Sequence, residues 1–157
     1  MNMCDFKESG GKHDFCKTFM YSIHQMYFLV EKRLEHVLIK AKYISCSQFM
    51  ILVGFRCGCD APVSQSSIAE RLHLTEATVS RHISTLVEMG LLSRTEDKAN
   101  RRKHIITITP KGNKTFDSAR KLIDKELESI FSVIKEKDRS NIIKNFSEVL
   151  NSLLSKK

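Results

Sequence analysis

Two short helical patterns follow one another closely between residues 64 and 90, and each carries its own start signal. Ser64 is a good N-cap for the first, because a serine hydroxyl accepts a hydrogen bond from an otherwise unpaired backbone N–H in the first turn. Val63 and Ile68 stand at the spacing of a hydrophobic staple around it. The start of this helix is therefore specified locally.

The second helix has the same start signals, an N-cap and a hydrophobic staple. Thr75 is its expected N-cap, with Leu74 and Val79 at the staple positions, and Gly90 is expected to end it just after Met89. The helical period places an apolar face opposite a polar one. The apolar face carries Val79, Ile83, Leu86 and Val87, and the polar face carries Ala77, Thr78, Arg81 and Thr85. A short polar face that bears an arginine near a helix N-terminus is suited to reading the major groove.

A basic hairpin is expected directly after the second helix. Both ends of 91–109 favour strands, whereas 97–100 is polar and turn-forming. The returning arm carries Arg101, Arg102 and Lys103, and guanidinium groups at a hairpin tip suit the narrow minor groove of A·T-rich DNA. Either half alone is more often simple packing or a solvated loop. In this order and spacing the two together indicate a winged helix-turn-helix that binds DNA.

These residues resemble the winged-helix MarR regulators over about residues 45–112. The run SQSSIAERLHLTEATVSRHISTLVEMGLL is similar to the family's helix-turn-helix, and NRRKHIITITPKG is similar to its wing. Asn100 departs from the pattern, because the family usually has an aspartate there that orients the wing arginine. His73 also departs, since a glycine is common in that turn, although histidine is among the residues that adopt a left-handed conformation at some cost.

The resemblance implies a single mainly α chain with a small β wing, an α+β fold with the winged helix-turn-helix at 45–112 and helical dimerisation regions at 13–42 and 113–157. It implies a homodimer that binds a palindromic operator in double-stranded DNA, with half-sites about one helical turn, roughly 34–36 Å, apart. Repression by promoter occupancy is the family's usual mode, but these residues do not separate a repressor from an activator. The implied effector is a small aromatic or anionic molecule in a cleft between the DNA-binding lobe and the dimer helices. No sequence motif marks that cleft.

The expected DNA contacts divide by role. Thr78 and Arg81 are expected to read bases, with Thr75 and His82 nearer the phosphates. Arg102 is expected to enter the minor groove, while the other basic groups hold backbone phosphates. The full set of expected DNA-binding residues is Ser64, Thr75, Thr78, Arg81, His82, Arg94, Arg101, Arg102 and Lys103.

Apolar residues at steps of three and four predict long helices on both sides of this region. Residues 14–41 are expected to form one, Pro110 to open another that runs through Ile134, and Asp138 to cap a last one. Their broad apolar stripes must be covered. A second copy of the chain is the expected cover, and an intramolecular bundle is the alternative.

Composition agrees with this reading. The chain has 157 residues, 41% of them hydrophobic, which suffices for one domain with a core. Its formal net charge of +8 favours an anionic partner, although the local cluster in the hairpin carries the phosphate argument better than the total. The sequence has no apolar run of 18 residues and no signal peptide, so a soluble cytoplasmic protein without a membrane partner is expected.

The cysteines are Cys4, Cys16, Cys46, Cys57 and Cys59, an odd number that favours reduced thiols over a disulfide framework. Zinc is not expected, because Cys57-Gly-Cys59 lacks the usual spacing and a second pair. Cys46 begins a helix, where the dipole can lower a thiol pKa, but burial is the better interpretation.

Cys16 is a candidate redox switch, since peroxide sensors of the similar family keep a reactive cysteine near the start of the first helix with tyrosines nearby. Tyr21 and Tyr27 follow it in the sequence. Packing is the alternative. An enzyme is not expected, because the chain has no Gly-rich phosphate loop, no Gly-x-Ser-x-Gly and no His-Glu-x-x-His, and no cofactor is implied. A winged helix used for protein contact, or for general DNA coating without an effector, stays open.

Overall fold

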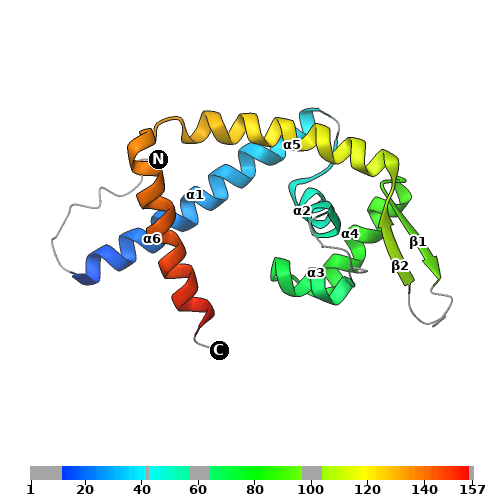
Figure 1. Ribbon diagram of the computed structural model, residues 1–157, viewed down its shortest axis with the longest axis horizontal. Helices are drawn as coiled ribbons and strands as arrows, with labels where there is room; N and C mark the ends of the chain where they lie inside the picture. The colour runs from blue at the N-terminus through cyan, green and yellow to red at the C-terminus, as the bar shows by residue number, and fades with distance from the viewer. Residues whose placement is uncertain (1–11, 42, 57–63, 97–103, 156–157) are drawn as a thin grey trace, which may run out of the picture.

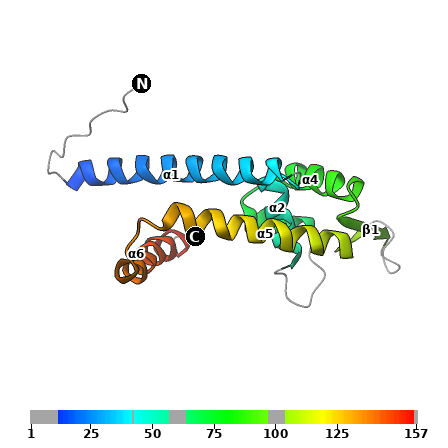
Figure 2. The ribbon, with the colours of Figure 1, turned by 90° about the horizontal axis from the view of Figure 1, so that it is seen from above.

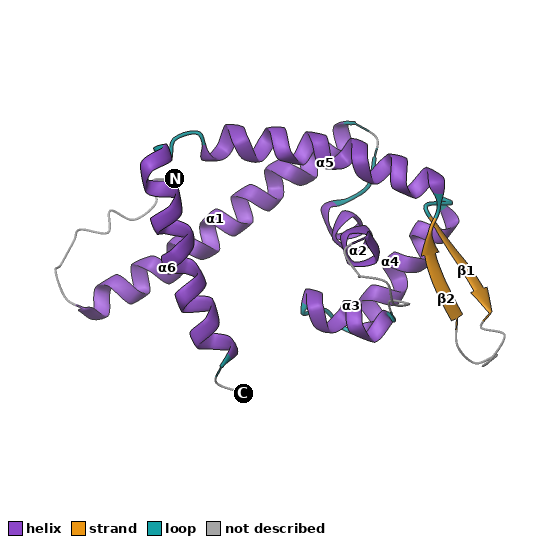
Figure 3. Cartoon of the chain, in the orientation of Figure 1, coloured by secondary structure: helices purple, strands orange, loops and turns teal. Residues whose placement is uncertain are grey.

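The computed structural model describes residues 12–41, 43–56, 64–96 and 104–155. The protein is mainly helical, and its one described sheet is an antiparallel pair of strands (Figure 3). The elements in chain order are α1 (Lys12–Lys40), α2 (Cys46–Arg56), α3 (Gln65–Leu72), α4 (Glu76–Glu88), β1 (Leu92–Glu96), β2 (His104–Ile108), α5 (Pro110–Phe131) and α6 (Glu136–Leu154). The expected α+β class, mainly α with a small β wing, is confirmed.

The two longest helices, α1 and α5, run along the length of an extended molecule (Figures 1 and 2). Helices α2, α3 and α4 and the β1–β2 hairpin gather at one end of this pair. Helix α6 lies at the opposite end, where it crosses the N-terminal half of α1. The chain therefore separates a compact lobe from a long helical arm.

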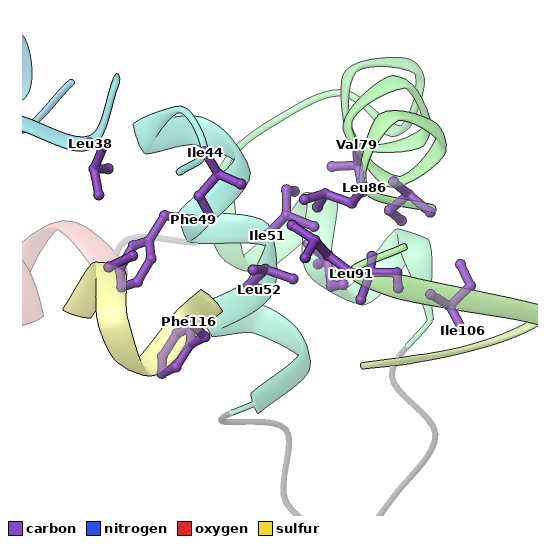
Figure 4. Packing of buried hydrophobic residues seen from close by; sticks show 14 of the residues in the cluster. Leu38, Ile44, Phe49, Ile51, Leu52, Val79, Leu86, Leu91, Ile106 and Phe116 are labelled. Carbon is purple, nitrogen blue, oxygen red and sulfur yellow. The ribbon is translucent and has the colours of Figure 1, made fainter. Parts of the chain in front are cut away.

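The hydrophobic core lies in the compact lobe (Figure 4). Phe49 of α2 stacks on Phe116 of α5 with ring centroids 5.0 Å apart, which ties the lobe to the long helix. The completely buried large side chains come from six successive segments of the chain: Leu38, Ile51, Leu52, Ile68, Val79, Ile83, Leu86, Leu91 and Leu92. The apolar face predicted for α4 is thus the face that packs into the core.

The local start and stop signals act as predicted. Ser64 Oγ accepts a hydrogen bond from Ser67 N at 3.1 Å, and Thr75 Oγ1 accepts one from Thr78 N at 3.2 Å. His73, with φ of 52°, adopts the left-handed conformation that closes α3. Gly90 has φ of 70° and ends α4. Val63, the proposed first staple residue, lies outside the described residues.

The predicted boundaries of the last two helices are wrong. Pro110 does open α5, with Thr109 as its N-cap, but the helix ends at Phe131 before reaching Ile134. The last helix begins at Glu136 with Lys135 at the N-cap position, and no side chain caps it. Asp138 therefore lies inside the first turn, where its carboxylate faces the positive end of the helix dipole, and an acidic first turn replaces the expected cap.

Helix α6 leaves its apolar stripe uncovered. Every described residue of this helix is exposed, and its ring contact with α1 is Phe146 against Phe19 at 5.7 Å. The exposed apolar side chains of α6 are Ile142, Ile143, Phe146, Val149, Leu150, Leu153 and Leu154. Within the described ranges, no intramolecular bundle buries this stripe. None of the described helices is both long enough and apolar enough to cross a bilayer.

Candidate nucleic-acid interface

Helix α4 is anchored by one face and open on the other. Val79, Ile83 and Leu86 are almost completely buried, so the helix cannot rotate without exposing core side chains. Arg81 and Thr85 lie exposed on the opposite side, and Thr85 Oγ1 donates a hydrogen bond to the Arg81 carbonyl at 3.2 Å. The polar face predicted for base reading is therefore presented outward on a fixed helix.

The helix starts bring hydroxyl groups together. Thr75 Oγ1 and Thr78 Oγ1 are 2.9 Å apart and form a hydrogen bond. The half-buried Thr78 hydroxyl therefore contacts the N-cap residue of α4. At the start of α3, Ser64 Oγ and Ser66 Oγ are also 2.9 Å apart, and Ser66 is exposed. Sequence reasoning missed Ser66 because it considered only the cap residue itself. Hydroxyls at helix N-termini, next to free N–H groups, are well suited to phosphate oxygens.

The remaining predicted residues are placed unevenly. His82 is half-buried, whereas Arg94 on β1 is exposed. Arg94 is the cross-strand partner of Ile106, so the two side chains lie on the same face of the hairpin. Ile106 is buried on that face, whereas the longer arginine side chain extends to solvent. Arg101, Arg102 and Lys103, together with Asn100, lie outside the described residues.

A junction that the sequence did not reveal holds α4, the hairpin and α5 together. Thr109 Oγ1 donates to the Gly90 carbonyl at 2.8 Å and accepts from Gly112 N at 2.9 Å. Lys111 Nζ donates to the Met89 carbonyl at 2.7 Å, at the negative end of α4. In the sequence the Thr-Pro-Lys-Gly run is only the end of the wing pattern, whereas in the structure it fixes the end of α4 to the start of α5.

A cavity of about 540 Å³ lies between α1, α2, the turn before α4 and the end of α5. This size is in the range of small-molecule sites. Leu72 and Leu74, on either side of His73, form the wall next to α4. The other lining residues are Ile23, Met26, Tyr27, Val30, Glu31, Leu34, Cys46, Ser47, Met50 and Phe131.

Cys46 lies in the wall of this cavity at the first turn of α2. Its backbone N donates to Glu35 Oε2 at 2.5 Å. Burial raises the pKa of the Cys46 thiol, and the carboxylates of Glu31 and Glu35 raise it further. The helix start therefore does not activate this thiol, and the interpretation of Cys46 as a partly buried residue is confirmed.

Cys16 has a different environment from Cys46. Its side chain is exposed on α1, next to the stacked rings of Phe15 and Phe19, whose centroids are 5.4 Å apart. Tyr27, in contrast, lines the cavity, and the carboxylate of Glu31 is the main reason that its pKa is raised. Within the described parts of the chain no group of three metal-ligating side chains is present; Cys57 and Cys59 lie outside them.

The geometry defines a class of protein. Two capped helices joined by a left-handed turn, a fixed outward polar face and an adjoining antiparallel hairpin make a winged helix-turn-helix, here carried on a long helical arm.

Comparison with known proteins agrees with this class. Residues 44–104 match the model of the MarR family. The HTH-type transcriptional regulator BilQ of Clostridium symbiosum is 28% identical over 94 residues, which cover 60% of this chain and 62% of BilQ. The match thus spans somewhat less than two thirds of that relative. The resemblance to the MarR family that the sequence indicated is confirmed over residues 44–104.

Solved structures show how far the fold extends. The transcriptional regulator BldR of Sulfolobus solfataricus superposes with a TM-score of 0.75 and 25% identity, and the match covers 94% of this chain and 99% of BldR. MepR of S. aureus, solved as a complex with DNA, also gives a TM-score of 0.75, with 21% identity and coverage of 85% of this chain and 97% of MepR. The likeness therefore includes the helical arm as well as the winged lobe.

Proposed function

We propose that this protein is a sequence-specific DNA-binding transcriptional regulator, and that α4 is its recognition helix. The single observation that carries the proposal is the outward polar face of α4, with Arg81 exposed opposite a fully buried apolar face. Arg81 is the proposed base-reading residue, since arginine pairs in a bidentate way with guanine in the major groove. The hydroxyls of Ser64 and Thr75 are placed at helix starts, where they support phosphate contacts.

We propose that the protein acts as a homodimer on a palindrome. The support is the apolar stripe of α6, which a single chain leaves in water although it holds seven large apolar side chains. Covering such a stripe with its own copy gives a two-fold assembly. Two recognition helices related by that axis would read half-sites about one helical turn, roughly 34–36 Å, apart.

We propose that a small molecule in the 540 Å³ cavity controls DNA affinity, with repression as the mode of action. Support comes from the cavity wall: Leu74 immediately precedes Thr75, the N-cap of α4, and Leu72 ends α3. A molecule that fills the space between these leucines and α1 would bias the position of the recognition helix against the arm. It would act by binding one arrangement of the lobe more tightly than another.

Substitutions of two arginines test the DNA-binding proposal. Arg81→Ala should relax base preference at one symmetric pair of operator positions, costing about 1–3 kcal/mol of discrimination. Arg102→Ala should weaken binding to many sequences and lower the salt slope by about 0.9 per phosphate charge neutralised. Arg120→Ala, an exposed arginine on α5, is the matched control and should change neither. Binding is measured by fluorescence anisotropy on a randomised operator library at several salt concentrations.

Two results would each contradict a different part of the proposed DNA-binding mode. If Arg81→Ala keeps full base preference, α4 does not read the operator. If Arg102→Ala leaves affinity and salt dependence unchanged, the hairpin is not a minor-groove arm. Uniform coverage of DNA by the unaltered protein, without a confined footprint, would indicate a coating protein instead of a regulator.

A redox switch at Cys16 is the second candidate function, and the exposure of its thiol favours it. Oxidation to a sulfenic acid would add a polar group to α1, close to the crossing with α6. Peroxide should then weaken DNA binding, Cys16→Ser should abolish the response, and Cys46→Ser should preserve it, because the raised pKa of Cys46 keeps that thiol protonated. Anisotropy titrations with and without organic hydroperoxide measure this. If peroxide does not change DNA binding by the wild-type protein, Cys16 is not a redox switch.

A further inference from the structure

Among the described residues, the wall of the 540 Å³ cavity has one acidic side chain and no basic one. Glu31 is the ionisable carboxylate among the lining residues, and no Lys, Arg or His is found among those that the structure describes. The remaining polar groups of the wall are the Tyr27 hydroxyl, the Ser47 hydroxyl and the Cys46 thiol. A small aromatic anion of the kind implied by the resemblance would find no cation here and would lie against a carboxylate.

The Glu31 carboxylate has no ion-pair partner among the described residues. In the described part of the chain the ion pairs are Arg33–Glu126, Arg56–Asp117 and Arg120–Asp124, none of which includes Glu31. Tyr27 lies one helical turn earlier on α1, and the Glu31 carboxylate is the main reason that the pKa of its hydroxyl is raised. A neutral hydroxyl at this position supplies no positive charge to pair with the carboxylate.

Glu35 strengthens the negative potential on this side. It lies one turn after Glu31 on α1 and accepts the hydrogen bond from Cys46 N, and it lines a smaller adjoining cavity with Glu31. Lys32 is the positive side chain at that smaller cavity, but it is exposed and does not line the larger one. Glu31 contributes to both raised pKa values: it is the main cause for Tyr27, and for Cys46 it adds to the larger effect of burial.

We propose that the effector of this cavity is a cation with an apolar body, and that Glu31 is the residue that selects it. The apolar wall of Met26, Val30 and Met50 would hold the body, and the ammonium or amidinium group would lie at Glu31. An anion would instead meet a like charge in a partly desolvated site, which is unfavourable. This inference rests on the proposed function of the cavity as an effector site, and it replaces the anionic effector with a cationic one.

Three probes with the same body and different charge test the proposal: 4-phenylbutylammonium, 4-phenylbutanol and 4-phenylbutyrate. Each is titrated calorimetrically into the full-length protein without DNA. The ammonium should bind at least about tenfold more tightly than the butyrate, which corresponds to about 1.4 kcal/mol. Glu31→Gln should reduce that ratio to within about threefold. Glu128→Gln, an exposed acid on α5 away from the cavity wall, should keep the full ratio.

A second readout assigns binding to this cavity. Because Cys46 lies in the wall, bound ammonium should slow its modification by a neutral maleimide several-fold, measured on the Cys46 peptide by mass spectrometry, and leave modification of Cys16 unchanged. This measurement also keeps the test valid if Glu31→Gln loses stability.

Several results would overturn the inference: no measurable binding of the ammonium, equal or tighter binding of the butyrate, an unchanged ratio in Glu31→Gln, or no protection of Cys46. The proposed DNA-binding function is checked separately by operator affinity without any probe. A protein that binds its operator but not the ammonium contradicts this inference alone, and one that binds the ammonium but no DNA contradicts the proposed regulator.

Discussion

Replacing Leu150 and Leu153 with aspartate is expected to convert the protein from a dimer to a monomer. Both side chains are more than half exposed in the single chain, so the substitution should leave the fold of one copy intact. In the proposed dimer each leucine would gain roughly 1.5–3 kcal/mol by burial, and two copies contribute four such side chains. Even with part of this lost to ordering, the dissociation constant should rise by about a thousandfold or more.

Sedimentation velocity over a range of protein concentrations measures this change, and anisotropy on a palindromic duplex measures its consequence for DNA binding. Asn145→Asp is the control, because it adds a negative charge to α6 without changing the apolar stripe. A double variant that stays dimeric and binds the palindrome normally would show that α6 does not form the dimer. Deletion of residues 136–157 should agree with the double variant.

Gly112→Ala is expected to be the most destabilising single substitution of a small residue in the described chain. A Cβ at this position would overlap the backbone oxygen of Leu91 and lie 2.9 Å from Ile108 Cγ1. The backbone oxygen cannot move aside as a flexible side chain can, and it accepts hydrogen bonds from Thr109. We therefore expect a loss of about 3 kcal/mol in the free energy of unfolding, at the upper end of the usual overpacking cost.

Thermal and urea denaturation followed by circular dichroism test this expectation, which corresponds to a fall of roughly 6–12 °C in Tm for a chain of this size. Gly54→Ala is the control, because a Cβ there would make only an ordinary contact with the Ile68 side chain, at 3.4 Å, and alanine favours the helix. DNA affinity should fall in Gly112→Ala as well, since the same junction sets α4 against the hairpin. A Gly112→Ala protein as stable as the Gly54→Ala protein would show that the junction yields easily.

The prediction of the helix pair from sequence succeeded because its signals are local. Ser64, Thr75 and Gly90 act on backbone groups within a few residues of themselves, so the chain near them determines the caps whatever the tertiary structure is. The apolar period of α4 is likewise a local property, and it identified the buried face correctly. His73 adopts its left-handed conformation because a tight turn at that point requires it.

The boundary between α5 and α6 was mispredicted for the opposite reason. Asp138 is a good N-cap type, and Lys135 is not, so local preference favoured the later start. The turn closes earlier through backbone contacts, with Asp138 N donating to the Lys135 carbonyl at 2.9 Å. Arg139 Nε also donates a hydrogen bond to the Ile134 carbonyl at 3.3 Å, which links the first turn of α6 to the preceding turn.

The sequence by itself determined the resemblance to the MarR family, the helix pair with its outward polar face, and the apolar stripes of the terminal helices, because each depends on residues close together along the chain. Only the tertiary structure decided the cavity. Its walls come from α1, α2, the turn before α4 and the end of α5, which lie far apart in the sequence, so no local pattern contains them. The charge beside that cavity is decided in the same way, because whether Glu31 has a basic partner depends on which distant side chains the fold brings near it.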